Sequence, residues 1–210
     1  MGDSKQDLVL VTEFGPFRQC LVNPSWEAAK GWKITGLGEG IEAQTAEIPV
    51  SYAKAQQILA EIWQNMKPKV AVHLGIAPGT KCIILEQTAK NHDYKDRDVC
   101  GFCPAGNFCI EGGAEQLDSI ISMRSLAKHL KGQGIYIIYS RDAGRYLCDF
   151  VYYCSLYYGQ RRAALIHVPV SGSLAHPDRL VPQLQAIILA LLQQLDKHSS
   201  SPTKSTCSAG

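Results

Sequence analysis

Short apolar runs alternate with helical segments along most of this chain, and that alternation restricts its fold more than any other feature. The predicted strands cover residues 8–14, 70–75, 82–85, 135–140 and 163–168. One predicted helix begins at Asn23, and four further helices are predicted over residues 51–66, 118–131, 147–158 and 177–197. Strands that alternate with helices favour a mostly parallel sheet with helices on both faces. We therefore predict an α/β fold with its functional residues at strand ends and in the loops that follow them.

The size and composition of the chain are typical of a single domain. Of its 210 residues, 46% are hydrophobic and 19% are charged, which is enough to bury a substantial core. We predict one domain over residues 8–197, with disordered, mainly polar ends at 1–7 and 198–210. Residues 91–113 are rich in Asn, Asp, Gly and Cys and lack periodicity, so we expect a long surface excursion there.

The charge of the chain gives no reason to expect a polyanionic partner. Lys and Arg number 21 against 19 Asp and Glu, a formal net charge of +2, so we predict neither nucleic acid nor a membrane as partner. The first seven residues lack the apolar centre of a signal peptide, and the apolar run 186–192 is too short to span a bilayer. We therefore expect a cytoplasmic protein whose eight cysteines are reduced thiols.

Cys148 is a candidate nucleophile because of its place in the predicted elements. It follows a glycine-containing loop and falls in the first turn of the helix predicted over 147–158. Unpaired amides and the positive end of the helix dipole favour a thiolate at such a position, and the same amides can bind a developing oxyanion. The ordinary alternative is a small core residue, since cysteines in apolar helices usually pack inside.

Two further side chains suit the chemistry of a reactive thiol. His167 stands near the carboxyl end of the run ALIHVP, where it can act as a base, although an isolated strand histidine is more often structural. Glu86 ends the run CIILE and can orient an imidazole, although it can equally well point into water. We also expect the strands 70–75 and 82–85 to end on the same edge of the sheet.

A metal site is the alternative that the cysteine spacing raises. The segment CGFCPAGNFC holds Cys100, Cys103 and Cys109, and His92 lies upstream, so three thiolates and an imidazole are available for zinc. The chain has one CxxC pair, however, and lacks the second pair of the usual spacing. A zinc-bound interaction module is therefore the weaker hypothesis.

Four separated motifs together resemble the pyroglutamyl-peptidase I family of cysteine exopeptidases. They are VTEFGPF followed by VNPSW, then IILE, then SRDAGRYLCDFVYY, then LIHVP, and the resemblance covers about residues 8–196. The segments FGPFRQCLVN and ALIHVP look nearest to a vertebrate branch of that family, the pyroglutamyl-peptidase I-like proteins. The resemblance implies a three-layer α/β/α sandwich with a central twisted, mostly parallel sheet.

The resemblance also implies a function for individual positions. Cys148 matches the family's nucleophile, His167 its base and Glu86 its acid. The positions that match its substrate pocket are Phe14, Phe17, Asn23 and Tyr146, for which turn or core packing is the ordinary alternative. The implied reaction is hydrolysis of the bond after an N-terminal pyroglutamyl residue of small peptides, through a thioester and without a metal or organic cofactor. The oligomeric state stays open.

One position departs from the family pattern. Glu13 stands between Thr12 and Phe14, where the family usually has glycine. If that position requires a positive φ or lies against the substrate, a glutamate strains the backbone or crowds the pocket, and its charge can alter the imidazole pKa. The rival hypothesis is therefore a weakened or inactive paralogue that keeps the fold and acts as a binding or regulatory protein.

Overall fold

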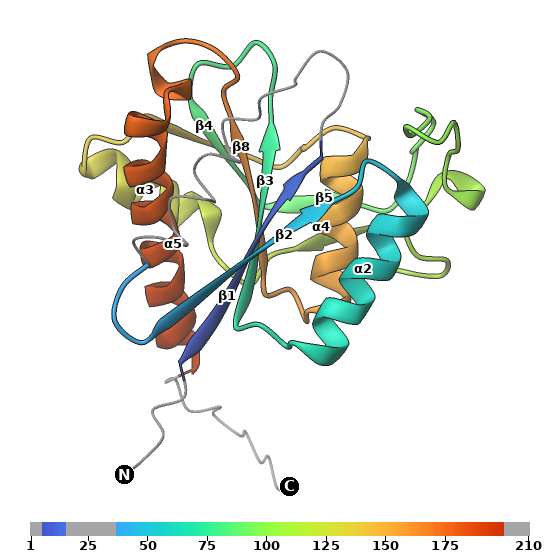
Figure 1. Ribbon diagram of the computed structural model, residues 1–210, viewed down its shortest axis with the longest axis horizontal. Helices are drawn as coiled ribbons and strands as arrows, with labels where there is room; N and C mark the ends of the chain where they lie inside the picture. Colours follow the sequence, from blue (N-terminus) through green and yellow to red (C-terminus); the bar gives the residue numbers. More distant parts are fainter. Residues whose placement is uncertain (1–5, 16–36, 200–210) are drawn as a thin grey trace, which may run out of the picture.

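The computed structural model describes residues 6–15 and 37–199, with only the backbone for residues 198 and 199 (Figure 1). The strands are β1 (Asp7–Phe14), β2 (Ile41–Ile48), β3 (Val70–Ile76), β4 (Ile83–Glu86), β5 (Thr88–Lys90), β6 (Gln116–Asp118), β7 (Ile137–Ser140) and β8 (Ala163–Val168). The α-helices are α2 (Tyr52–Asn65), α3 (Met123–Gly132), α4 (Leu147–Tyr158) and α5 (Pro177–Ser199). Two single 3-10 turns lie at Ala105–Asn107 and Ser173–Ala175.

Within the described part of the chain, six strands form the central sheet in the order β2-β1-β3-β8-β4-β7. The pairs β1–β2, β1–β3, β3–β8 and β4–β7 are parallel, whereas β4 is antiparallel to β8. The prediction of a mostly parallel sheet is therefore confirmed. Our expectation that β3 and β4 end on the same edge of the sheet is wrong, because the two strands run in opposite directions. Strands β4 and β7 run against the other four, and only the tertiary pairing reveals this.

The helices cover both faces of this sheet, which gives the three predicted layers. Helices α2 and α4 lie on one face, and α3 and α5 lie on the other (Figure 1). Successive side chains along each strand point to opposite faces of the sheet and pack in the two cores in turn. In β1, for example, Val9 and Val11 pack on the α3/α5 side, and Leu10 packs on the α2/α4 side. The α/β/α sandwich is thus held by two apolar cores on one twisted sheet.

The differences from the predicted elements have local causes. The missed strand β2 (IEAQTAEI) is a half-exposed edge strand with little apolar character. Helix α3 begins later than expected because residues 116–118 pair with β5 as β6, and Ser122 then caps the helix by accepting from the Ser125 N–H. Strand β1 begins at Asp7 and α5 continues to Ser199, so residues 7, 198 and 199 belong to regular elements and not to the predicted disordered ends. The helix start predicted at Asn23 lies outside the described residues.

Length and apolarity together decide whether a helix can cross a bilayer. Among the described residues, no helix has enough of both to do so.

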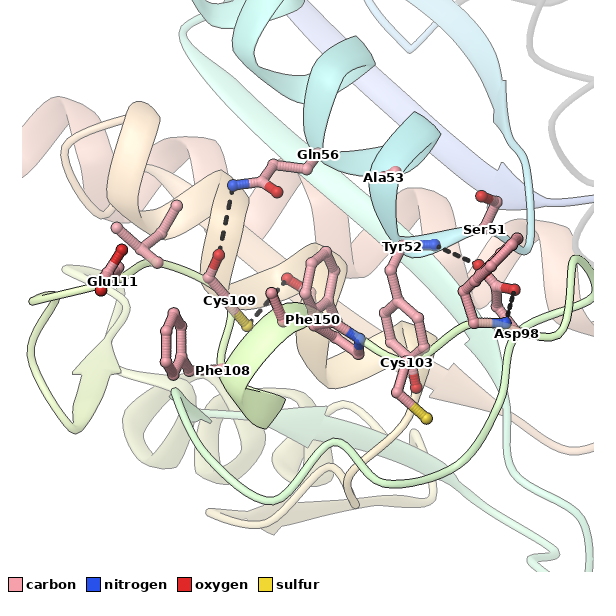
Figure 2. Close-up of a pocket in the computed structure, with 14 residues that line it drawn as sticks. Ser51, Tyr52, Ala53, Gln56, Asp98, Cys103, Phe108, Cys109, Glu111 and Phe150 are labelled. Carbon is pink, nitrogen blue, oxygen red and sulfur yellow. Dashed lines mark hydrogen bonds between the residues drawn. The ribbon is translucent and has the colours of Figure 1, made fainter.

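The excursion over residues 91–113 is anchored to the helices of the α2/α4 face. The carboxylate of Asp98 accepts from the backbone N–H groups of Tyr52, Cys100 and Phe102 at 3.1, 2.8 and 3.0 Å, and Figure 2 shows its bond to the first residue of α2. Burial by itself raises the pKa of Asp98, but these backbone hydrogen bonds outweigh it and lower the pKa. Asp98 therefore caps α2 and holds the excursion with one charged side chain.

The substitution Asp98→Ala should lower the free energy of unfolding by about 1–3 kcal/mol, because it leaves three N–H groups without their acceptor. Chemical denaturation monitored by circular dichroism measures this change. Asp96→Ala is the matched control: the Asp96 side chain is exposed, and its loss should change stability by no more than about 0.5 kcal/mol. Equal effects of the two substitutions would contradict the capping role.

Candidate active site

Glu86 and His167 meet across the antiparallel pair that β4 and β8 form in the central sheet. Glu86 is the last residue of β4 and pairs with Leu165, while His167 on β8 pairs with Ile84. Alternation therefore points both side chains to the α2/α4 face. The Oε1 atom of Glu86 lies 3.0 Å from Nδ1 of His167, and the two residues are 2% and 6% exposed. The carboxylate thus holds the imidazole from one side inside the protein.

Cys148 approaches the other side of the same imidazole from helix α4. It lies in the first turn of the helix and is half-buried against the α2/α4 core. A Cβ atom added at Gly75 on β3 would lie 2.9 Å from Sγ of Cys148 and 3.1 Å from Nε2 of His167. The thiol and the ring nitrogen therefore converge on one small volume. The structure brings together the three residues that the sequence separated by up to 81 positions.

The surroundings of His167 favour its charged form. Burial alone lowers the pKa of His167, but hydrogen bonds and charge interactions with Cys148 and Glu86 outweigh this effect and raise the pKa to about 10. An imidazolium between a sulfur and a carboxylate is the electrostatic arrangement that stabilises an adjacent thiolate. A charged imidazole beside a sulfur is the arrangement that a cysteine nucleophile requires.

The start of helix α4 offers hydrogen-bond donors beside the thiol. Its N-cap residue, Tyr146, makes no side-chain cap bond to the helix. The first N–H groups of a helix have no acceptor within the helix itself, and they lie at the positive end of its dipole. The start of α4 therefore supplies backbone donors beside Cys148 of the kind that can stabilise a developing oxyanion.

Asp149 is a buried acid beside Cys148 that the sequence analysis did not single out. It is fully buried, and its Oδ2 atom accepts from the Tyr94 hydroxyl at 2.8 Å and from the Lys90 N–H at 3.4 Å. Burial raises the pKa of Asp149 to about 7, against the lowering effect of Tyr94 and Arg145. The GRYLCD motif contains this residue, but only the fold shows that it connects the start of α4 to the excursion.

A second strand histidine, His73, has quite different surroundings. It is fully buried on β3, and its Nδ1 atom lies 2.6 Å from the Thr12 hydroxyl oxygen. Burial lowers the pKa of His73 to about 3, so its ring is neutral at physiological pH. In the described part of the chain, His167 is the strand histidine that contacts both a thiol and a carboxylate.

Two of the four predicted pocket residues lie in the described part of the chain. Phe14 ends β1 and packs against the α2/α4 core, on the side that carries Cys148. Tyr146 directly precedes α4; its hydroxyl donates to the Arg97 carbonyl at 3.2 Å, and its ring makes an edge contact with Tyr52. Phe17 and Asn23 lie outside the described residues.

The pocket of Figure 2 lies on a different part of the same face, between α2 and the excursion. Its walls include Tyr52, Phe102, Phe108 and Phe150, but none of its 14 lining residues is Cys148, His167 or Glu86. It is therefore a neighbouring hollow and not the place where the thiol and the imidazole meet.

Glu13 does not have the strained geometry that we considered. Its φ is not positive, and it pairs with Leu74 in regular parallel register. Because Val9, Val11 and Leu74 pack on the α3/α5 side, alternation directs the Glu13 side chain to that face, opposite the thiol and the imidazole. The side chain is 2% exposed. The condition under which a glutamate would strain the backbone at this position is therefore not met.

The arrangement of the Cys-rich segment does not support the zinc hypothesis. Cys109 is buried against the Phe150 carbonyl, Cys103 donates to the Lys95 carbonyl, and Cys100 is exposed. Across residues 6–15 and 37–199, no group of three or more His, Cys, Asp or Glu side chains gathers as metal ligands would. The three sulfurs therefore have different surroundings.

A thiol, an imidazole and a carboxylate grouped on an α/β/α sandwich are the arrangement of a cysteine hydrolase. The family model described as pyroglutamyl peptidase matches residues 7–190 of this chain. The chain therefore belongs to the pyroglutamyl peptidase family.

Relatives of this family resemble the chain over most of its length. Mouse pyroglutamyl-peptidase 1 is 40% identical over 191 residues, which cover 90% of this chain and 91% of the mouse protein. The human pyroglutamyl-peptidase 1-like protein is 39% identical over 164 residues, covering 77% of this chain and 84% of that protein. The identities of 40% and 39% are too similar to assign the chain to the pyroglutamyl-peptidase 1 branch or to the pyroglutamyl-peptidase 1-like branch. Pyrrolidone carboxyl peptidase from Thermococcus litoralis superposes with a TM-score of 0.80 at 25% identity, covering 92% of this chain and 96% of its own.

The imidazole of His167 should titrate with a pKa near 10, and Glu86→Gln should lower that pKa because it removes one of the two groups that favour the imidazolium. Histidine side-chain NMR over pH 5–11 measures both values. Because the folded pKa exceeds the unfolded value of about 6.5, the associated stability is fully present below about pH 6.5 and is lost towards pH 10. Glu39→Gln, at an exposed turn, should leave the titration unchanged.

Proposed function

We propose that Cys148 is the nucleophile, His167 the general acid and base, and Glu86 the orienting carboxylate of a cysteine exopeptidase that removes N-terminal pyroglutamate. The observation that carries this proposal is the imidazole of His167, which has the Glu86 carboxylate 3.0 Å from Nδ1 and the Cys148 sulfur on its Nε2 side. Family membership supplies the substrate class, which is peptides that begin with pyroglutamate.

The reaction follows from the charges of these three groups. The Cys148 thiolate attacks the carbonyl carbon that joins pyroglutamate to the next residue, and Nε2 of His167 donates its proton to the departing amine. A thioester to Cys148 remains. The imidazole, now neutral, takes a proton from water, the resulting hydroxide attacks the thioester, and free pyroglutamate leaves as the thiolate and imidazolium return. Glu86 keeps Nδ1 protonated throughout, so that Nε2 faces the substrate.

Backbone amides at the start of α4 stabilise the oxyanion in this scheme. Attack by the thiolate converts the carbonyl oxygen into an anion, and the first-turn N–H groups beside Cys148 can donate to it. These donors are part of a helix with a buried apolar face, so they need no rearrangement when charge develops.

Selection of pyroglutamate rests on what its ring lacks. The lactam has no charged amine, whereas an ordinary N-terminus would bring an ammonium group into an apolar site at a high desolvation cost. In this proposal Phe14 and Phe17 enclose the flat ring, and Asn23 and Tyr146 supply polar contacts. The support is the position of Phe14 and Tyr146 against the same core as Cys148.

Glu13 remains the observation that favours the rival function, a paralogue with little or no activity. A buried carboxylate stands where the family pattern has glycine, and the surrounding backbone is an ordinary strand. Its direction towards the α3/α5 face supports the enzyme, because the reacting groups lie on the other face.

Branch, location and partners complete the proposal. The segments FGPFRQCLVN and ALIHVP support a place in the pyroglutamyl-peptidase I-like branch. The six cysteines in the described part of the chain are free, which supports the reducing environment of the cytoplasm. With a formal net charge of +2, we propose small peptides as partners and neither nucleic acid nor membranes.

The direct test is the release of a fluorescent amine from a pyroglutamyl amide. Wild-type protein should release it, and Cys148→Ser should reduce kcat/KM by at least ~10³-fold, because serine lacks a reactive anion at neutral pH. Cys82→Ser, at a buried cysteine on the approach to β4, is a control that should keep most of the activity. Glu13→Gly should change the rate less than ~10-fold if the enzyme function holds. Folded wild type and Glu13→Gly that are both inert would refute it.

The reactivity of the thiols gives a second test that needs no substrate. At neutral pH, iodoacetamide should modify Cys148 at least ~10-fold faster than Cys154, because Cys148 is half-buried beside an imidazolium whereas Cys154 is fully buried in the core. Peptide mass spectrometry over a time course assigns each rate. His167→Ala should slow the modification of Cys148, because it removes the imidazolium beside the sulfur. Equal rates for the two cysteines in the folded wild type would exclude Cys148 as an activated thiol.

A further inference from the structure

Gly75 lies directly beneath the place where the thiol and the imidazole meet. It belongs to β3, in the run VAVHLGI, and pairs in parallel register with His167 on β8. Ala71, His73 and Gly75 face the α2/α4 side in turn, since Val72 and Leu74 pack on the other core. Among these three positions, the one next to the reacting groups carries no side chain.

The space above Gly75 is already occupied by both reacting side chains. A Cβ atom at this position would lie 2.8 Å from Cδ2 and 3.1 Å from Nε2 of His167, and 2.9 Å from Sγ of Cys148. Contacts below 3.0 Å do not persist, so a methyl group must displace the ring, the sulfur or the strand. The ring is held on its far side by Glu86, and the sulfur is attached to a buried helix.

The backbone itself does not require glycine at this position. Gly75 is not among the glycines with positive φ, and it lies within a regular strand where any L-residue can adopt the conformation. Glycine inside a strand weakens it, and it commonly marks a close approach of another group. The close approach here is that of Cys148 and His167.

The geometry points to Gly75 as a positioning residue of the reaction: its missing side chain lets the Cys148 sulfur and the His167 ring approach each other above β3. This inference rests on the proposed roles of Cys148 and His167. In this proposal Gly75 does not contact the substrate and takes no part in proton transfer. It sets the distance between two groups whose reaction depends on alignment within a fraction of an ångström.

Gly75→Ala tests the inference through activity and thiol chemistry. The variant should lose at least ~100-fold in kcat/KM, because the added methyl separates thiol and imidazole. The rate of Cys148 alkylation should fall at pH 7 and recover only at higher pH, which a general loss of stability would not produce. Gly132→Ala is the matched control: a Cβ there meets nothing within 4 Å, and activity should stay within about twofold. Gly75→Ala with activity within about threefold of wild type would overturn the inference.

A thermal cycle tests the same contact without any activity. Gly75→Ala should lower Tm by roughly 5 °C or more in the wild-type background. In the Cys148→Ala/His167→Ala background, where the clashing atoms are gone, the same substitution should lower Tm by less than half as much. If Gly75→Ala alone does not fold, folding of the triple variant supports the inference. An equal loss in both backgrounds, or a triple variant that also fails to fold, overturns it.

The two proposals fail in different ways. Wild-type protein that releases no amine from a pyroglutamyl amide refutes the proposed function, while the thermal cycle still decides whether Gly75 is kept clear for the two side chains. An active wild type with no coupling in the cycle refutes the role of Gly75 alone.

Discussion

The hydrogen bond between Glu86 and His167 is the interaction on which the rest of the site depends. It joins two buried groups at 3.0 Å, and a carboxylate or an imidazolium in such a place needs a partner. The bond exists because β4 runs antiparallel to β8, so that the end of one strand lies beside the middle of the next. The carboxylate fixes the ring, and the ring in turn provides a fixed partner for the thiol.

Helix α4 and strand β3 then bring the third group into place. The helix supplies Cys148 in its first turn, and it is held by the α2/α4 core and by the hydrogen bond that Asp149 accepts from Tyr94 of the excursion. Strand β3 contributes by having no side chain at Gly75. The site is thus formed by the contacts that Glu86 and Cys148 make with His167 and by the missing side chain of Gly75. These four residues lie on four different elements, β4, α4, β8 and β3.

Many of the strands and helices could be predicted from the amino-acid sequence alone. The strand 163–168 and the helix 147–158 were predicted with their observed bounds, because an apolar run and a helical period are local signals. Strand β2 was missed because an exposed edge strand carries no such signal, and the late start of α3 depends on the pairing of β6 with β5. The question over Glu13 arose from a motif, and only the alternation of residues along the strand shows which face of the sheet its side chain takes.

The sequence by itself determined the fold class and the family, and it singled out Cys148, His167 and Glu86 as the proposed catalytic set, since sequence motifs and apolar periodicity are properties of neighbouring residues. Only the tertiary structure decided that β4 runs against β8, that Glu86 reaches Nδ1 of His167 and that Gly75 must leave room for both reacting side chains. The physical reason is that strand direction and close approach are set by pairing between distant segments, and no local stretch of chain contains that information.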